Sequence, residues 1–236
     1  RVQFQFDDAL PHQSKAIEST VSAFNGIPKR HQGVYASQDY FLEPRNPQIT
    51  AGTRLLQNVQ ALQLQNDIFT DETLHSAQFG IEMETGTGKT YVYIRSILTL
   101  YETYGFKKFL IVVPSVAIRK GVEKTLEQLQ DHLKALHNVD IAKHSFVYDS
   151  GNVGRMKAFV ENHDLDICVI NSQAFASAKT IIQKELEQGG EILWEKIKDI
   201  HPIVIIDEPQ KVEGTQRRPS KSREQLSELQ PLFELK

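Results

Sequence analysis

Apolar residues follow two alternating patterns along this chain. In some stretches, such as residues 109–113 and 203–206, every residue is apolar, and between such runs the apolar residues recur three and four positions apart. A strand that is apolar throughout is buried on both faces, as in a parallel sheet, whereas the wider spacing is that of an amphipathic helix. The pattern predicts an α/β fold with a mostly parallel sheet and helices on both faces. We expect strands at residues 79–83, 109–113, 144–148, 166–170 and 203–206, and helices at residues 11–24, 53–64, 89–101 and 191–200.

The longest amphipathic stretch follows residue 113. Its apolar residues are spaced four, three, four and three apart, so they form a single stripe that we expect to be buried along its whole length. The stripe consists of Val122, Leu126, Leu129, Leu133 and Leu136.

Two segments break the alternation of strands and helices. Glycine and proline punctuate residues 26–48, so we interpret residues 26–76 as a loop-rich insertion that contains the expected helix at 53–64. Residues 214–222 are polar and basic, and we expect them to form a mobile loop. The basic residues Arg217, Arg218, Lys221 and Arg223 then belong to a solvated surface.

Composition narrows the class of protein. The 236 residues fit one large domain, or a domain with an insertion, and the formal net charge of -3 provides no global basic field. The only cysteine, Cys168, lies within an apolar run, which predicts a small buried side chain and excludes a disulfide framework or a cysteine-based zinc site. No apolar run approaches the roughly 20 residues that span a bilayer, and the first residues lack the apolar core of a secretory signal. We expect a cytoplasmic protein without a membrane segment.

The clearest chemical signal is the sequence Met-Glu-Thr-Gly-Thr-Gly-Lys-Thr at residues 83–90, between an expected strand and an expected helix. This is the context of a Walker A phosphate loop, in which glycines let backbone N–H groups surround phosphate oxygens. Lys89 is expected to contact the β- and γ-phosphates, and the Thr90 hydroxyl to ligate Mg²⁺. The general pattern begins with glycine, where this chain has Met83. The predicted ATP-binding residues of the loop are Thr85, Gly86, Thr87, Gly88, Lys89 and Thr90.

A pair of acids, Asp207 and Glu208, follows the apolar run at 203–206. Ligands of open α/β sheets bind beyond the carboxyl ends of the strands, so the pair is expected near the phosphate loop. Asp207 then holds Mg²⁺, directly or through water, and Glu208 acts as general base on the attacking water. Taken alone, the pair is equally compatible with two solvated acids at the end of a buried strand. The predicted catalytic residues are Glu208, Asp207 and Lys89.

The two motifs together resemble those of superfamily-two helicases, whose motors consist of two RecA-like domains. The segment Phe6–Gln13 is similar to the adenine-reading segment of that family, which assigns the adenine edge to Gln13. Phe4 and Phe6 either stack on the base or, more simply, pack under the first helix. Residues 114–119 and 171–173 are similar to motifs that contact the nucleic-acid backbone. The resemblance therefore implies DNA contacts at Ser115, Arg119 and Ser172, against the simpler interpretation of Arg119 as a solvated side chain.

The sequence Asp-Glu-Pro-Gln at 207–210, with the phosphate loop and Val-Val-Pro-Ser-Val-Ala-Ile-Arg at 112–119, narrows the resemblance to the Res subunit of type III restriction enzymes. This implies an ATP- and Mg²⁺-dependent motor that translocates on duplex DNA and works with a methyltransferase (Mod) subunit. No Ser-Ala-Thr motif follows the acidic pair, and neither a second motor domain nor a nuclease motif is visible. Residues 1–236 are therefore expected to form one RecA-like domain, the first motor domain, without the arginine finger of the second.

Two other functions stay open at this point. One is the motor domain of another superfamily-two DNA helicase, acting in repair or remodelling. The other is a nucleotide-binding module that controls a partner without turnover, which the presence of Glu208 disfavours. A small-molecule P-loop kinase fits less well, because no acceptor lid is visible and the Gln13 segment has no place in it.

Overall fold

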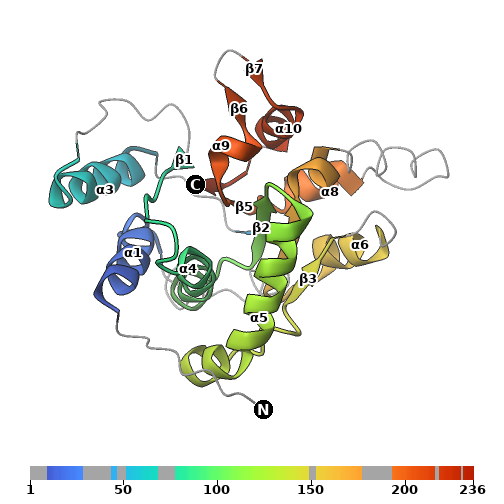
Figure 1. Cartoon of the computed structure of the whole chain (residues 1–236), viewed down its shortest axis with the longest axis horizontal. Coiled ribbons are helices and arrows are strands. Elements are labelled where there is room, and N and C mark those ends of the chain that lie inside the picture. Colours follow the sequence, from blue (N-terminus) through green and yellow to red (C-terminus); the bar gives the residue numbers. More distant parts are fainter. Residues whose placement is uncertain are drawn as a thin grey trace.

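A sheet of six parallel strands forms the centre of the computed structural model, which describes residues 10–28, 44–46, 52–68, 78–148, 153–176, 193–215, 218–229 and 231–236 (Figure 1). The strand order is β1-β8-β5-β2-β4-β3, and every pairing in this sheet is parallel. The predicted α/β class with a mostly parallel sheet is confirmed. The strands are β1 (Gln78–Phe79), β2 (Lys108–Val113), β3 (Ser145–Val147), β4 (Asp166–Asn171), β5 (Ile203–Ile206) and β8 (Phe233–Leu235).

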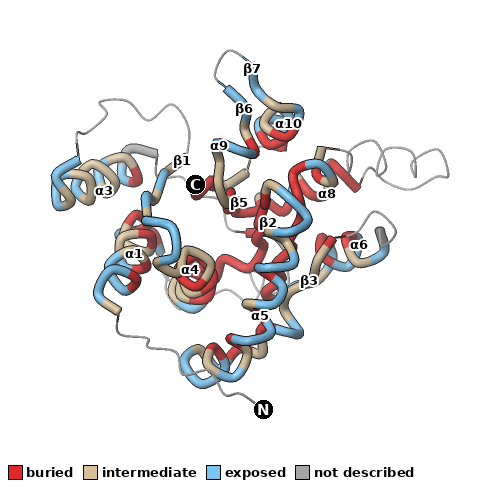
Figure 2. The backbone as a smooth tube through the Cα atoms, in the orientation of Figure 1, coloured by how far each residue is buried: buried red, intermediate tan, exposed pale blue. Residues whose placement is uncertain are grey.

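Helices cover both faces of the sheet, as the apolar strands predict. One core joins the sheet to α1, α3, α4 and α5, and the other joins it to α6, α8, α9 and α10. Figure 1 shows α1 and α4 to the left of the strands and α6 and α8 to the right, and in Figure 2 the buried residues concentrate along the central strands. The helices are α1 (Pro11–Ser22), α3 (Gly52–Gln65), α4 (Lys89–Tyr104), α5 (Val116–His137), α6 (Val153–Glu161), α8 (Leu193–Asp199), α9 (Pro209–Val212) and α10 (Lys221–Leu229).

Two neighbouring inner strands, β2 and β4, are buried at every position. All six residues of β2 and all six of β4 are buried, and Leu110 pairs with Cys168 across the two strands. Cys168 is completely buried, and burial raises the pKa of its thiol. This confirms the interpretation of Cys168 as a small core residue.

The long helix α5 extends beyond the sheet that it covers. Its 22 residues measure about 33 Å, whereas the six residues of β2 span about 20 Å. Four members of the predicted stripe are buried, but Leu136, in the last turn, is 39% exposed. The prediction of a stripe buried along its whole length is therefore wrong at Leu136, because the helix is longer than the surface against which it packs.

The first strand is shorter than expected. β1 consists of Gln78 and Phe79 alone, and the expected strand at 79–83 is wrong beyond its first residue. β1 lies at the edge of the sheet and pairs only with β8, itself three residues long. Two further hydrogen bonds continue the pairing before the chain turns into the loop. They run from the N–H of Lys236 to the carbonyl of Phe79 and from the N–H of Ile81 to the carbonyl of Lys236.

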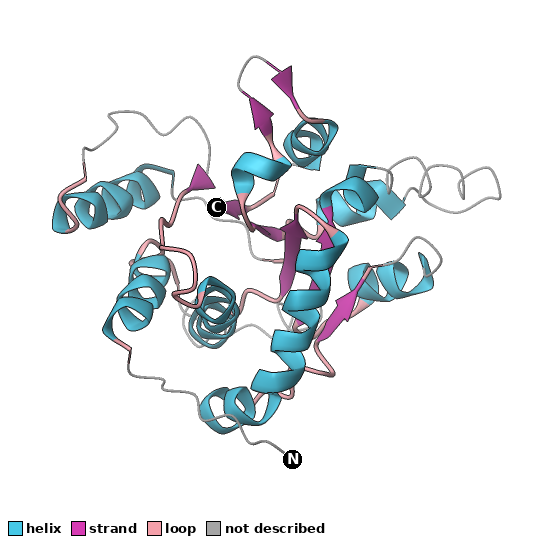
Figure 3. Ribbon diagram, in the orientation of Figure 1, coloured by secondary structure: helices cyan, strands magenta, loops and turns pink. Residues whose placement is uncertain are grey.

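Most of the described residues of 214–222 form regular structure, so the expectation of a loop is wrong for them. β6 (Gly214–Thr215) and β7 (Arg218–Pro219) form an antiparallel pair, visible at the top of Figure 3, and α10 begins at Lys221. Arg223 is not solvated either. Its guanidinium donates to Glu213 at 3.1 Å and to Glu234 at 2.6 and 3.1 Å, because α10 packs back against β8. Arg217 lies outside the described residues, and Arg218 and Lys221 are exposed as expected.

The described parts of residues 26–76 pack against the domain. Leu55 of α3 is buried in the core below α1 and α4, and Asn58 donates to the carbonyls of Ala23 and Asn25. Asn46 is completely buried, and its side chain bonds backbone groups at Lys107, Lys108 and His201, at the start of β2 and β5. None of the helices in the described ranges is long and apolar enough to cross a membrane.

Candidate functional site

The loop between β1 and α4 opens its backbone toward solvent. Gly86 and Gly88 have φ of 83° and 90°, left-handed conformations that glycine adopts without steric cost. Gly88 is the N-cap of α4 and provides no side-chain cap, so the first N–H groups of the helix are left to solvent or to a ligand. A Cβ atom added at Gly86 would meet nothing within 4 Å. An exposed loop with two left-handed glycines and an uncapped helix start could bind an anion.

The N-terminal turn of α1 contacts this loop directly. The Gln13 amide donates from Nε2 to the carbonyl of Thr87 at 2.9 Å, and His12 Nε2 lies 3.2 Å from the same oxygen. A Cβ atom at Gly88 would lie only 2.4 Å from Gln13 Nε2, so the glycine makes room for the amide. The structure thus brings the predicted adenine-reading residue to the predicted phosphate loop. His12 was not identified from the sequence, where nothing but its place beside Gln13 could have singled it out.

Asp207 lies at the end of β5, next to the carboxyl end of β2. Its N–H donates to the carbonyl of Val112 at 3.0 Å, which continues the pairing of the two strands by one residue. Burial, and then the charge of Glu208, raise the pKa of Asp207, whereas the ammonium of Lys89 lowers it. The charge of Lys89 therefore acts on Asp207, although the two residues come from opposite halves of the chain.

Glu208 has an unusual backbone conformation. Its φ of 51° and ψ of 63° place it in the left-handed region, where a non-glycine residue is strained. Pro209 follows directly, and a proline disfavours the right-handed helical conformation at the residue before it. The turn directs the Glu208 carboxylate to Lys211, whose Nζ lies 2.5 Å from Oε2. The predicted general base is thus held in an ion pair in this structure.

A further residue of the site, Tyr93, was missed in the sequence. It lies on α4 three positions after Thr90, a spacing that places both side chains on one side of the helix. Tyr93 is 6% exposed. Burial, and then the nearby Asp207 carboxylate, raise the pKa of its hydroxyl, while the Thr90 hydroxyl acts in the opposite direction. The spacing in Lys-Thr-Tyr-Val-Tyr was the available signal, but it is indistinguishable from that of an ordinary core residue.

The three residues predicted to contact DNA lie around the ends of β2, β3 and β4. The Ser115 hydroxyl caps α5 by accepting from the N–H of Ile118, and Arg119 donates to the carbonyl of Tyr148 at 3.3 Å. Ser172 is 7% exposed, and its hydroxyl lies 3.4 Å from the carbonyl of Pro114. All three side chains contact the protein itself in this structure, so their DNA contacts stay a prediction.

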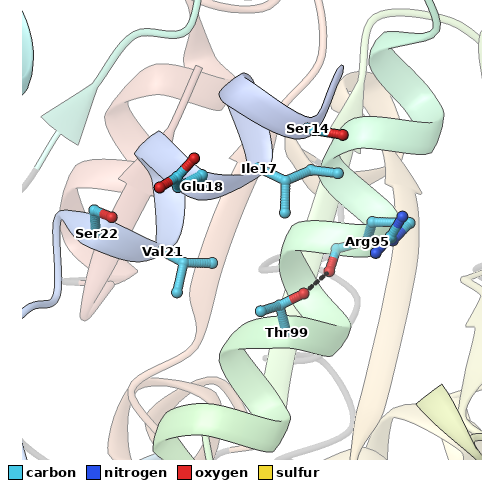
Figure 4. A pocket seen from close by; sticks show the side chains of 7 residues that line it. All are labelled: Ser14, Ile17, Glu18, Val21, Ser22, Arg95 and Thr99. Atoms are coloured by element: carbon cyan, nitrogen blue, oxygen red, sulfur yellow. Dashed lines mark hydrogen bonds between the residues drawn. The ribbon is translucent and has the colours of Figure 1, made fainter. Parts of the chain in front are cut away.

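Two surface cavities lie away from the residues predicted to bind nucleotide, metal or DNA. One of about 330 Å³ is bounded by five residues of α1, from Ser14 to Ser22, and by Arg95 and Thr99 of α4 (Figure 4). Another, of about 740 Å³, lies beside Arg45, Lys196 and His201, close to the start of β5. Neither is lined by any of the residues predicted to bind nucleotide, metal or DNA.

Comparison with known proteins shows the family of this chain. The family model described as "Type III restriction enzyme, res subunit" matches residues 41–229, which include the phosphate loop and the acidic pair. The chain belongs to this family. Similar relatives are the Res subunits of StyLTI from Salmonella typhimurium (27% identical over 224 residues, 86% of this chain and 20% of the relative), EcoP15I from Escherichia coli (26% over 230 residues, 87% and 23%) and EcoPI from Escherichia phage P1 (26% over 231 residues, 88% and 23%). The resemblance inferred from the sequence motifs is confirmed, and the chain spans about a fifth of the length of these Res subunits.

Proposed function

We propose that this chain is an ATP-binding and ATP-hydrolysing motor domain of a type III restriction enzyme Res subunit. The observation that carries the proposal is the influence of the Lys89 charge on Asp207, whose pKa it lowers. Lys89 begins the helix after the glycine-rich loop, and Asp207 follows the buried strand β5. Both therefore lie beyond the carboxyl ends of the strands, where α/β proteins bind ligands. Membership of the Res family supports the same function.

The phosphates of ATP fit the loop between β1 and α4. Backbone N–H groups at residues 85–90, together with the positive end of the α4 dipole, favour an anion at this position. Lys89 adds a full positive charge for the β- and γ-phosphates. One N–H of the Gln13 amide donates a hydrogen bond to the carbonyl of Thr87. Its oxygen and second N–H suit the adjacent acceptor and donor on the adenine edge.

The residues present also fit a magnesium ion. Among the described residues, no three His, Cys, Asp or Glu side chains are close enough to form a metal cluster by themselves. This suits Mg²⁺, which is usually bound by one or two protein oxygens with phosphate oxygens and water. The oxygens that would hold it are those of Thr90 and Asp207. A bound Mg²⁺ neutralises charge on the phosphates.

Glu208 is proposed to accept the proton of the attacking water. In the present structure its carboxylate is paired with Lys211, so this role requires the pair to open or to admit the water between its members. The strained conformation of Glu208 fits a residue whose position serves the chemistry rather than the stability of the turn.

The names of the relatives bear on the function of the complete protein. They are Res subunits of restriction-modification enzymes, so we propose that the complete protein acts on duplex DNA through its phosphate backbone, with a methyltransferase (Mod) subunit as its partner. Ser115, Arg119 and Ser172 remain the proposed DNA contacts. With a net charge of -3, the chain is expected to bind DNA weakly and in a salt-dependent way.

The proposal is tested by calorimetry of ATP with Mg²⁺ on the chain and on Lys89→Ala. We expect the variant to lose at least about tenfold in affinity, because a charge-assisted contact to a phosphate contributes about 1.5–3 kcal/mol. Lys124→Ala is the matched control, since Lys124 is exposed on α5, away from the loop. Equal affinities of wild type and Lys89→Ala, or no binding by the wild type, would overturn the proposal.

A further inference from the structure

The buried hydroxyl of Tyr93 has no evident structural role. Tyr93 is 6% exposed, and its ring belongs to the core beneath the sheet. Its hydroxyl lies near that of Thr90 but makes no aligned hydrogen bond among the described residues. A buried polar group without a partner destabilises a fold, and phenylalanine would fill the same space without that cost. We therefore expect the hydroxyl to gain a hydrogen-bond partner when a ligand binds.

The surroundings of this hydroxyl indicate what that partner is. The groups that act on it are the carboxylate of Asp207 and the hydroxyl of Thr90, which are the two proposed magnesium ligands. Helix α4 carries both Thr90 and Tyr93, whereas Asp207 comes from the end of β5. Tyr93 thus lies on the helix that follows the phosphate loop, near enough to the end of β5 for the Asp207 charge to act on its hydroxyl.

We propose that Tyr93 is a positioning residue for the metal site: its hydroxyl donates a hydrogen bond to the Asp207 carboxylate when a divalent cation is bound. The bond leaves one carboxylate oxygen facing the cation and prevents the side chain from rotating away. Hydrogen bonds of this kind, from groups that do not touch the metal, orient carboxylate ligands and increase metal affinity. The inference rests on the proposed nucleotide–magnesium function and names a residue that the sequence motifs do not include.

Comparable tyrosines on the same helix make the test specific. Tyr91 donates to or accepts from His132 Nε2 at 2.9 Å, so its hydroxyl already has a partner on α5. Tyr104 is 1% exposed, and its ring packs near Phe24 and Phe106. It lies eleven residues further along α4, about 16 Å from Tyr93. Tyr104→Phe removes the same atom from the same helix, far from the acids, and is the matched control.

The experiment measures binding of Mn²⁺, a paramagnetic substitute for Mg²⁺, by electron paramagnetic resonance with a saturating non-hydrolysable ATP analogue. We expect Tyr93→Phe to weaken Mn²⁺ binding about tenfold and Tyr104→Phe to leave it unchanged. Affinity for the analogue in EDTA should be the same in all three proteins. In an Asp207→Asn background, Tyr93→Phe should have no further effect, because the carboxylate that it orients is gone.

Thermal unfolding in EDTA shows that the variants are folded, and Tyr93→Phe should melt at or above the wild-type temperature. Wild-type Mn²⁺ affinity in Tyr93→Phe would overturn the role of Tyr93 while leaving the proposed function intact. Equal weakening by Tyr93→Phe with and without the Asp207 carboxylate would also overturn it. A wild-type chain that binds neither the analogue nor Mn²⁺ would overturn the proposed function, and the Tyr93 inference with it.

Discussion

Single residues in the loop before α4 are constrained for different physical reasons. Gly86 and Gly88 both have positive φ, but space is open around Gly86, whereas the amide of Gln13 occupies the space beside Gly88. The end of a glutamine side chain moves easily, so a methyl group at position 88 would displace it rather than distort the backbone. The predicted consequence is loss of the bond between Gln13 and the carbonyl of Thr87.

This difference is testable with two alanine variants. Gly86→Ala and Gly88→Ala should each lower the free energy of unfolding by about 1 kcal/mol, because alanine is strained at positive φ. Gly88→Ala should lower it by about 1 kcal/mol more, through loss of the Gln13 bond. Urea unfolding of both variants, alone and combined with Gln13→Ala, provides the measurement. The extra effect of Gly88→Ala should disappear without Gln13, and its persistence would show that the clash lies elsewhere.

Lys108 lies in an environment that disfavours the charged form of its side chain. It is completely buried at the start of β2, its Nζ has no hydrogen-bond partner in the described part of the chain, and it lies 5.4 Å from the centre of the Phe159 ring. Burial lowers the pKa of Lys108 from 10.5 to about 8, although the nearby Asp166 opposes the shift. Asp166 is itself paired with Arg155 through two bonds of 2.8 and 2.9 Å.

Lys108→Met should therefore stabilise the protein at pH 7, by on the order of 1–3 kcal/mol. The folded pKa is below the unfolded one, so between pH 8 and 10.5 the unfolded chain binds more protons, and wild-type stability rises with pH. The advantage of Lys108→Met should shrink across that range. Urea unfolding at pH 7, 8.5 and 10 measures it, and a difference independent of pH would contradict the shifted pKa.

At the scale of elements, a helix is stabilised by the surface that it covers rather than by its whole apolar stripe. Leu129 and Leu136 belong to the same stripe of α5, but Leu129 is completely buried and Leu136 is 39% exposed. Ser115 determines where the helix begins, because its side chain caps the N–H of Ile118. The helix ends at Asn138, which adopts a left-handed conformation with φ of 51° and so stops the helical repeat.

Leu129→Ala and Leu136→Ala compare the two environments directly. The first should lower the free energy of unfolding by about 2–5 kcal/mol, through a cavity in the core. The second should lower it by less than about 1 kcal/mol, because little apolar surface is lost from contact. Chemical denaturation followed by circular dichroism gives both values. Similar losses in the two variants would mean that another part of the protein covers the last turn of α5.

At the scale of the whole molecule, one parallel sheet gathers the proposed site at one edge. The loop after β1 and the acids after β5 are separated in the sheet by β8 and meet through side chains from α4. The described residues contain a single six-stranded sheet, whereas the resemblance to superfamily-two helicases implies a motor of two such units. An arginine from the second unit is expected to complete the hydrolytic site.

We therefore predict that this chain binds ATP with Mg²⁺ much better than it hydrolyses it. An arginine finger contributes about 10³- to 10⁵-fold to the rate, whereas binding depends mainly on the loop, Lys89 and Gln13. The measurement is single-turnover hydrolysis by the chain and by a full-length Res subunit with DNA. Glu208→Gln should abolish turnover in both while ATP remains bound. Equal rates for the chain and the full-length subunit would refute the requirement for a second unit.

Local patterns were enough to predict much of the fold and the family to which the chain belongs. The strands at β2, β4 and β5, the helices α1, α4 and α5, and the loop at residues 83–90 follow from periodicity and from short motifs. Each depends on residues within one element, because burial on both faces, helical spacing and glycine in a phosphate loop leave local traces. Short elements such as α9 and the β6–β7 hairpin left no such trace.

Features that depend on distant partners were decided only in three dimensions. β1 stops after Phe79 because its sole neighbour is β8, at the far end of the described chain. Arg223 is paired rather than solvated because α10 returns to Glu213 and Glu234. The proposed role of Tyr93 depends on β5, which ends near enough for the Asp207 charge to raise the pKa of the Tyr93 hydroxyl. The sequence by itself determined the long, strongly patterned elements and the glycine-rich loop before α4, because their signals are local. The packing of remote segments decided the short elements and the ends, exposure and neighbours of the long ones.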